Sequence, residues 1–189
     1  KKIICDVGCG CGVNLFHCQP ESYGIEINKN KVEWGQKLGL NVFNRNVGED
    51  DLSDLPKAGV IWCGGVIEHV DNLHRFLVGL NELLITGGQL FIHASIVPSV
   101  PILQLLGGKL GAYMGGWYAP TMHCNAFTRK TLQYVCEAAG FETFEMSPFY
   151  PKPFSVMNKI PILRTMMGKV TWVGRKNNKK RATKSFQTR

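Results

Sequence analysis

The segment GCGCG at positions 8–12 separates a short apolar segment (2–7) from a second one that begins at Val13. Glycine adopts positive φ angles without steric penalty, so such a run suits a tight turn that another molecule can approach closely. If a strand precedes the turn and a helix follows it, the first N–H groups of the helix point toward that molecule. The chain is therefore expected to begin with a strand, a loop and a helix, with a ligand site at the edge of a sheet.

The cysteines in this run raise a metal-binding alternative, which their spacing disfavours. Structural zinc sites prefer Cys-x2-Cys pairs with a second pair downstream, whereas Cys9 and Cys11 form a Cys-x-Cys pair followed by Cys18. The chain contains seven cysteines, and an odd number argues against a disulfide framework. We expect no metal at this loop and a reducing, cytoplasmic environment.

Strand-length apolar segments alternate with segments of helical periodicity along the chain. The expected strands are 2–7, 22–27, 41–47, 58–63, 89–95, 141–146 and 169–173, and the expected helices are 13–18, 29–38, 73–84 and 128–139. Thr128 is a suitable N-cap for the last of these helices. Strands that alternate with helices form a parallel sheet covered by helices, so the sequence predicts an α/β fold.

Basic residues are concentrated at the end of the chain. Residues 175–189 contain seven of the 22 lysines and arginines and no acid, which leaves 15 basic against 14 acidic residues elsewhere. We therefore expect one domain over 1–176 and a basic tail over 177–189. Such a tail is either a solvated terminus or a contact with nucleic acid or an anionic membrane.

The chain starts with Lys1 rather than methionine, so we expect that an N-terminal part of a longer protein is missing. No apolar run reaches the roughly 18 residues that a membrane-spanning helix needs, and no secretory signal peptide is recognisable. We expect a cytoplasmic protein that contacts a membrane, if at all, only peripherally through the basic tail.

Glu26 lies at the end of the second expected strand, 20 residues after Asp6. In nucleotide-binding α/β folds, an acid at this place accepts hydrogen bonds from the hydroxyl groups of a ribose. The glycine run and Glu26 together predict a ligand that contains adenosine.

The segment DVGCGCG (6–12) resembles the D-x-G-x-G-x-G motif of class I S-adenosylmethionine-dependent methyltransferases. It differs from the dinucleotide fingerprint G-x-G-x-x-G, because Val13 stands where the third glycine would be. Further segments resemble the same family, in particular the group of the O-methyltransferases of ubiquinone biosynthesis. These segments are GIEIN (24–28), GVIWCGGVIEHV (59–70), LLITGGQLFI (83–92), AFTRKTLQYVCEAAGFE (126–142) and VTWVGRK (170–176).

The resemblance implies a Rossmann-like, doubly wound and mostly parallel seven-stranded sheet with an antiparallel last strand. It also implies S-adenosylmethionine as the cofactor, with S-adenosylhomocysteine as the product. The loop residues Gly8, Cys9 and Gly10 would pack against the methionine portion of the cofactor. Asp6 would contact its amino group.

The resemblance assigns the remaining cofactor contacts to the ends of the later strands. Glu26 would hold the ribose and Ile27 would lie beside the adenine. Asn46, where the family usually has aspartate, would accept from the adenine amino group through its carbonyl oxygen. The other expected contacts are Val47 beside Asn46, and Cys63 and Gly64 beneath the sulfonium.

Glu68, His69 and His123 are the candidate catalytic residues. Glu68-His69 resembles the Glu-x-x-Glu-His metal site of the ubiquinone-biosynthesis enzymes, but Gly65 replaces the first glutamate. We therefore expect no metal, and His69 as a general base. His123 would face the acceptor. In the alternative interpretation, Glu68 and His69 only cap and pack the following helix, and His123 is an exposed loop histidine.

Two apolar insertions, 96–120 and 149–167, interrupt the alternation of strands and helices and are rich in proline. In the resembled family, insertions at these places cover the acceptor site, so we expect lids over a small hydrophobic acceptor, with O-methylation favoured. One alternative function is methylation of protein or nucleic acid, although no DNA-methyltransferase motif follows the fourth strand and we expect no nucleic-acid partner. A non-catalytic module that only binds S-adenosylmethionine is the other.

Overall fold

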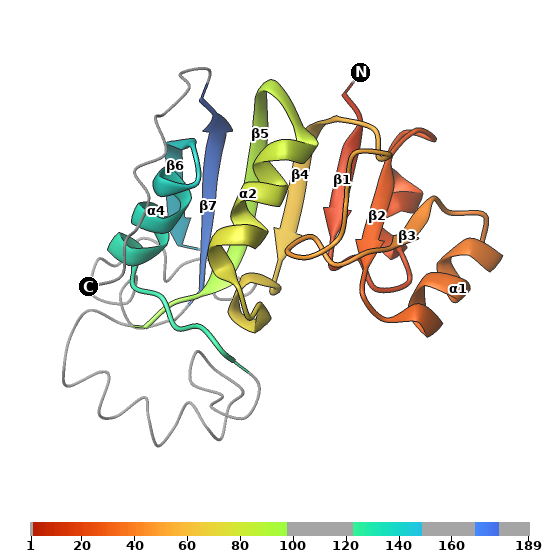
Figure 1. Cartoon of the computed structure of the whole chain (residues 1–189), viewed down its shortest axis with the longest axis horizontal. Coiled ribbons are helices and arrows are strands. Elements are labelled where there is room, and N and C mark those ends of the chain that lie inside the picture. Colours follow the sequence, from red (N-terminus) through yellow and green to blue (C-terminus); the bar gives the residue numbers. More distant parts are fainter. Residues whose placement is uncertain (1, 98–122, 149–168, 178–189) are drawn as a thin grey trace.

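The computed structural model describes residues 2–97, 123–148 and 169–177, and within them it contains one seven-stranded sheet with the order β3-β2-β1-β4-β5-β7-β6 (Figure 1). The strands are β1 (Ile4–Val7), β2 (Tyr23–Glu26), β3 (Val42–Asn44), β4 (Ala58–Gly64), β5 (Leu84–Ser95), β6 (Phe141–Pro148) and β7 (Lys169–Lys176). Six strands are parallel, and β7 is antiparallel to both of its neighbours. The predicted α/β fold with one antiparallel strand at the end of the chain is confirmed.

The helical elements connect these strands. They are η1 (Val13–His17), α1 (Lys29–Lys37), η2 (Ile67–His69), α2 (Leu73–Leu83) and α4 (Arg129–Ala138), with η1 and η2 being short 3-10 helices. The predicted N-cap of α4 is confirmed, because the Thr128 hydroxyl accepts from the Thr131 N–H and the Thr131 hydroxyl accepts from the Thr128 N–H. This reciprocal arrangement fixes the start of the helix.

Helices cover both faces of the sheet, as a doubly wound fold requires. Val7 pairs with Ile25 on β2 and with Cys63 on β4, and these side chains belong to a large core on the side of α2 and α4 (Figure 1). Because strand side chains alternate between faces, the side chain of Asp6, which pairs with Gly24, points away from this large core to the opposite face of the sheet. A smaller core there joins η1, α1 and β3 through Leu15, Val32 and Val42.

The apolar periodicity of α2 explains why this helix forms. Five of its residues are buried in the contact with the sheet, namely Phe76, Leu77, Gly79, Leu80 and Leu83. At its start the Asn72 side chain accepts a hydrogen bond from the Arg75 N–H at 3.0 Å, which satisfies one of the amide groups left free at a helix N-terminus. This bond fixes the start of α2, which residues 70–72 separate from η2.

Several predicted boundaries are wrong. The strand expected over 41–47 is only Val42–Asn44, and the last strand, expected over 169–173, continues to Lys176. Two further differences have a reason in the packing. The helix expected over 13–18 is instead the five-residue 3-10 helix η1. Only Leu15 among its residues is buried, and the burial of one side chain does not stabilise a longer α-helix. The strand expected over 89–95 already begins at Leu84, where the predicted helix 73–84 was to end. Leu83 and Leu84 are both buried, so apolar spacing alone did not reveal this change of structure.

The larger part of the two predicted insertions (96–120 and 149–167) and of the basic tail (177–189) lies outside the described residues. No helix of the part described is long and apolar enough to cross a membrane.

Candidate functional site

The glycine loop at positions 8–12 lies at the carboxyl ends of β1 and β2. Its three glycines have φ angles between 60° and 82°, a region that other residues adopt only at a cost. The Gly8 N–H donates to the Ile25 carbonyl oxygen at 2.8 Å. A side chain at Gly8 would also collide with Val66, in the segment that follows β4. Backbone conformation and close packing therefore both require glycine here.

Glu26 ends β2 with its carboxylate directed at this loop. Oε2 accepts a hydrogen bond from the Gly10 N–H and Oε1 accepts one from the Asn28 N–H, both at 2.9 Å. The residue is 7% exposed. Because each carboxylate oxygen can accept more than one hydrogen bond, both oxygens retain capacity for the hydroxyl groups of a ligand.

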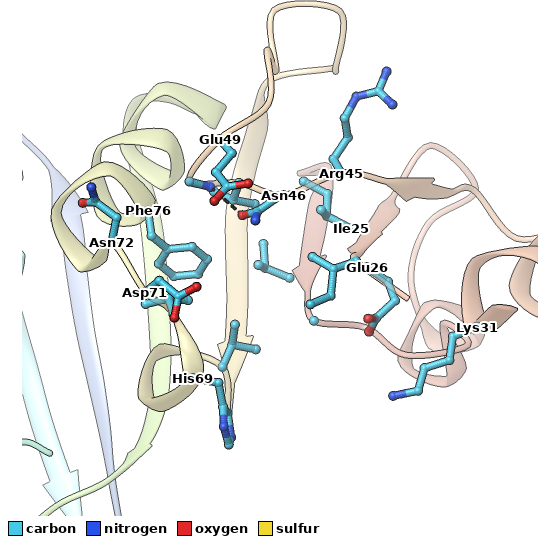
Figure 2. Close-up of a pocket in the computed structure, with 18 residues that line it drawn as sticks. Ile25, Glu26, Lys31, Arg45, Asn46, Glu49, His69, Asp71, Asn72 and Phe76 are labelled. Atoms are coloured by element: carbon cyan, nitrogen blue, oxygen red, sulfur yellow. Dashed lines mark hydrogen bonds between the residues drawn. The ribbon is translucent and has the colours of Figure 1, made fainter. Parts of the chain in front are cut away.

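A cavity of about 400 Å³ opens beside Glu26. Its walls come from the ends of β1 and β2, from the segments that follow β3 and β4, from the end of η2 with the residues after it, and from one residue each of α1 and α2. Figure 2 shows Phe76 and Asp71 on one side of this cavity, and Glu26 and Lys31 on the other. The residues predicted from the sequence that line it are Gly8, Glu26, Ile27, Asn46, Val47 and His69.

The sequence interpretation missed a large part of this wall. The apolar residues that it missed are Val7, Ile25, Val66, Val70 and Phe76, and the polar ones include Lys31, Arg45, Glu49, Asp71 and Asn72. The run from Val70 to Asn72 follows the Glu-His pair directly and ends at the helix N-cap. An N-cap after a parallel strand lies at the carboxyl edge of the sheet, and this signal could have indicated the missing wall.

Asn46 lies in the turn that ends β3. The side-chain Oδ1 of Asn46 accepts from the Gly48 N–H at 3.1 Å. The backbone N–H of Asn46 donates to Asp50 Oδ2 at 2.7 Å. One lone pair of Oδ1 is therefore already used within the turn. An adenine amino group would share this oxygen with Gly48.

Asp6 lies on the η1 side of β1 and is 3% exposed. Its Oδ2 accepts from the Asn14 side-chain amide at 3.0 Å. Burial raises the pKa of the Asp6 carboxyl above its ordinary value, and the hydrogen bond from Asn14 only partly opposes this. A cation placed nearby would stabilise the charged form. Asp6 is not among the residues that line the cavity beside Glu26.

The other predicted cofactor residues lie next to the cavity rather than in its wall. The Cys9 side chain packs on Gly24 of β2, and burial raises the pKa of its thiol to about 12. Cys63 is fully buried in the large core, which raises the pKa of its thiol far above the ordinary value. Gly10 is joined to the site by the hydrogen bond from its N–H to the Glu26 carboxylate. Gly64 is the last residue of β4.

Of the three candidate catalytic residues, His69 lines the cavity and is labelled at its lower edge in Figure 2. The His69 and His123 rings lie edge to face, with 4.9 Å between their centroids. Glu68 is 3% exposed, and its Oε1 accepts from the Ser95 N–H at 2.6 Å. The structure therefore brings all three residues together at the end of β5.

Among the residues described, no group of three or more His, Cys, Asp or Glu side chains is arranged to hold a metal ion.

The site suits a nucleoside joined to a cationic amino acid. Glu26 provides two acceptor atoms, Ile27 and Val47 provide apolar wall, and nothing lies within 4 Å of the place that a side chain at Gly10 would take. Asp6 adds a buried carboxyl group with a raised pKa, and a nearby cation would stabilise its charged form. S-adenosylmethionine combines these features, so the residues fit this molecule.

Comparisons with known proteins agree with this arrangement. A family profile described as "Methyltransferase domain" matches residues 1–145. The ubiquinone biosynthesis O-methyltransferase of Rickettsia prowazekii is 28% identical over 130 residues, which cover 65% of this chain and 51% of that protein. The chain spans about half the length of the curated relatives it matches.

Solved structures share the fold. An S-adenosylmethionine-dependent methyltransferase from Archaeoglobus fulgidus superposes with a TM-score of 0.66 at 21% identity, covering 93% of this chain and 86% of the other. The 1,6-didemethyltoxoflavin-N1-methyltransferase of Burkholderia thailandensis, solved with S-adenosylhomocysteine, gives 0.64 at 15% identity and covers 94% and 72%.

The strand order, the glycine loop and the acid on β2 define the class I S-adenosylmethionine-dependent methyltransferase fold. The chain belongs to the methyltransferase domain family that matches its first 145 residues, and two of the solved structures with the same fold hold S-adenosylhomocysteine, the product form of S-adenosylmethionine.

Proposed function

We propose that this chain transfers the methyl group of S-adenosylmethionine to a hydroxyl group of a small hydrophobic acceptor. The proposal rests on one observation: Glu26, which accepts a hydrogen bond from the Gly10 N–H, lines the same cavity as His69. An acid suited to a ribose and an imidazole suited to proton transfer thereby share one cavity.

The chain's own residues would bind and orient the cofactor. Glu26 accepts from the ribose hydroxyl groups, Asp6 pairs with the amino group, and the loop at positions 8–12 leaves space for the backbone to approach closely. When bound, S-adenosylmethionine supplies an electrophilic methyl group on a positively charged sulfur. The main task of the protein is therefore to align the acceptor and to exclude water.

His69 is the proposed general base, because it lines the cavity and imidazole can take a proton near neutral pH. It removes the proton of the acceptor hydroxyl group. His123, in edge-to-face contact with the His69 ring, holds the imidazole in place and faces the acceptor. This base is expected to contribute about 10²–10⁴-fold to the rate.

Two observations support a hydrophobic acceptor and an oxygen atom as the methylated position. The curated relatives of known activity that the chain matches are ubiquinone biosynthesis O-methyltransferases. The cavity wall beside His69 includes the apolar residues Val66, Val70 and Phe76. We also propose that the protein is cytoplasmic and works at an anionic membrane surface. A hydrophobic acceptor and the basic tail, most of which lies outside the described residues, support this location.

The experiment is a methyl-transfer assay with radiolabelled S-adenosylmethionine and a panel of alkylated phenols, proteins and nucleic acids. We expect transfer to a hydrophobic phenol, and a loss of about 10²-fold or more in kcat for His69→Ala. His74→Ala is the matched control, because His74 is exposed and does not line this cavity. Transfer only to protein or nucleic acid, or cofactor binding without transfer, would contradict the proposal.

A further inference from the structure

The Asn125 side chain joins the segment before α4 to η2. Its amide nitrogen, Nδ2, donates to the carbonyl oxygens of Ile67 and Val70, at 3.2 and 2.7 Å. These oxygens belong to the first residue of η2 and to the residue that follows η2. Because a carbonyl oxygen only accepts hydrogen bonds, the side chain at this position must supply two donor hydrogens, as an asparagine amide does.

The main chain of the same segment binds η2 through one acceptor atom. The N–H groups of Cys124 and Asn125 both donate to the Glu68 carbonyl oxygen, at 2.8 and 2.9 Å. Two bonds that end on one atom keep the segment close to η2 but allow it to rotate about that atom. The Asn125 amide adds two acceptors, one on either side of Glu68 in the chain. Three separate acceptors fix the orientation of the segment as well as its position.

The two segments that this amide joins carry the candidate histidines. His69 lies within the stretch 67–70 that the amide spans, and His123 lies two positions before Asn125. The two rings meet edge to face, with 4.9 Å between their centroids and an interplanar angle of 73°. An edge-to-face contact depends on the orientation of both rings, so it requires that the two segments keep one orientation.

We infer that Asn125 is a positioning residue, whose side-chain amide sets the His123 ring against the His69 ring. Asn125 does not line the cavity beside Glu26, so it acts through the histidines and not on the acceptor. The inference rests on the proposed function, because it takes His69 as the general base. In the rival role, the bonds of the amide only stabilise the fold, and the main-chain bonds alone place the His123 ring.

The first test measures the contact between the rings by NMR of protein labelled in its histidine side chains. In the otherwise native protein, His123→Ala should shift the His69 Cε1–Hε1 resonance, because an aromatic ring at 4.9 Å is removed. In an Asn125→Ala background, the same substitution should shift that resonance by less than about half as much, because the His123 ring no longer keeps one orientation.

Asn41→Ala is the matched control for both tests. The Asn41 amide also donates to two carbonyl oxygens, those of Pro20 and Ser22, at 2.8 and 3.4 Å. Asn41 does not line the cavity and belongs to neither histidine segment. Its substitution removes the same kind of bonds elsewhere in the fold, so it should leave both the His69 shift and kcat unchanged.

The second test measures kcat for methyl transfer in a double-mutant cycle. Asn125→Ala should lower kcat at least about threefold, with an unchanged affinity for S-adenosylhomocysteine. In a His123→Ala background, the same substitution should change kcat by less than about twofold, because the ring through which Asn125 acts is already missing.

A full His69 shift in the Asn125→Ala background would overturn the inference, and so would a loss in kcat that is equally large with and without His123. If Asn125→Ala does not fold, Asn125→Ser takes its place, because the serine hydroxyl can donate one hydrogen bond. Its His69 shift should be smaller than the native one, and a full shift would again overturn the inference. If the native protein transfers no methyl group, the proposed function fails, while the NMR coupling still decides the role of Asn125.

Discussion

The Glu26 carboxylate accepts a hydrogen bond from the Gly10 N–H, with 2.9 Å between Oε2 and the amide nitrogen. The residue assigned to the ribose thus also holds the loop assigned to the methionine portion of the cofactor. A second bond, from the Asn28 N–H to Oε1, fixes the carboxylate relative to the start of α1. The two parts of the cofactor site are therefore joined before any ligand binds, which lowers the ordering cost of binding.

Gly8→Ala should destabilise the protein more than Gly39→Ala. Both glycines have positive φ angles, 72° and 77°, so alanine costs about 1–2 kcal/mol at either position. Only at Gly8 would the added carbon also meet Val66, whereas nothing lies within 4 Å at Gly39. The collision should add about 1–3 kcal/mol to the loss in unfolding free energy. Urea unfolding measures both variants, and equal losses would show that the loop does not pack on Val66.

Asp6→Asn should make the cofactor-free protein more stable at neutral pH but weaken cofactor binding. Burial raises the folded-state pKa of Asp6, so the carboxyl's contribution to stability is present at low pH and decreases as the pH rises through that pKa. Asparagine carries no charge and avoids this loss, but it cannot form an ion pair with an amino group. Urea unfolding against pH measures the first effect and calorimetry the second. A variant that is less stable than the native protein at neutral pH would contradict the account.

Cys9 should react with iodoacetamide much more slowly than Cys124. Burial, with the charges of Asp6 and Glu26, raises the pKa of Cys9 to about 12, while Cys124 is exposed. At about pH 8 Cys9 holds very little thiolate, so its labelling should be at least about tenfold slower. Peptide mass spectrometry of the labelled native protein measures both rates. Equal rates would mean that Cys9 does not pack on β2 as described.

The sheet could be predicted from the sequence because each strand has a local signal. Apolar runs ended by glycine marked β1 and β4, and Thr128 marked the start of α4. The prediction failed where the outcome depended on tertiary packing. The 3-10 form of η1 follows from how little of it is buried, and the early start of β5 follows from the pairing of Leu84 with Ala58 on the neighbouring strand.

The same division applies to the candidate site. The glycine loop and Glu26 could be found because their types and spacing are set by local chain geometry. The bond from Ser95 to Glu68, and the contact between His69 and His123, join residues 27 and 54 positions apart, and no local pattern encodes them.

The most direct test of the cofactor site is a calorimetric titration with S-adenosylhomocysteine of the native protein, Glu26→Ala and the control Glu33→Ala. The native and control proteins should bind with equal affinity. Glu26→Ala should lose about 1.5–3 kcal/mol of binding free energy, or about 10–150-fold in affinity, because the charge-assisted hydrogen bonds to the ribose disappear. Native affinity in Glu26→Ala, or no binding by the native protein, would contradict the account.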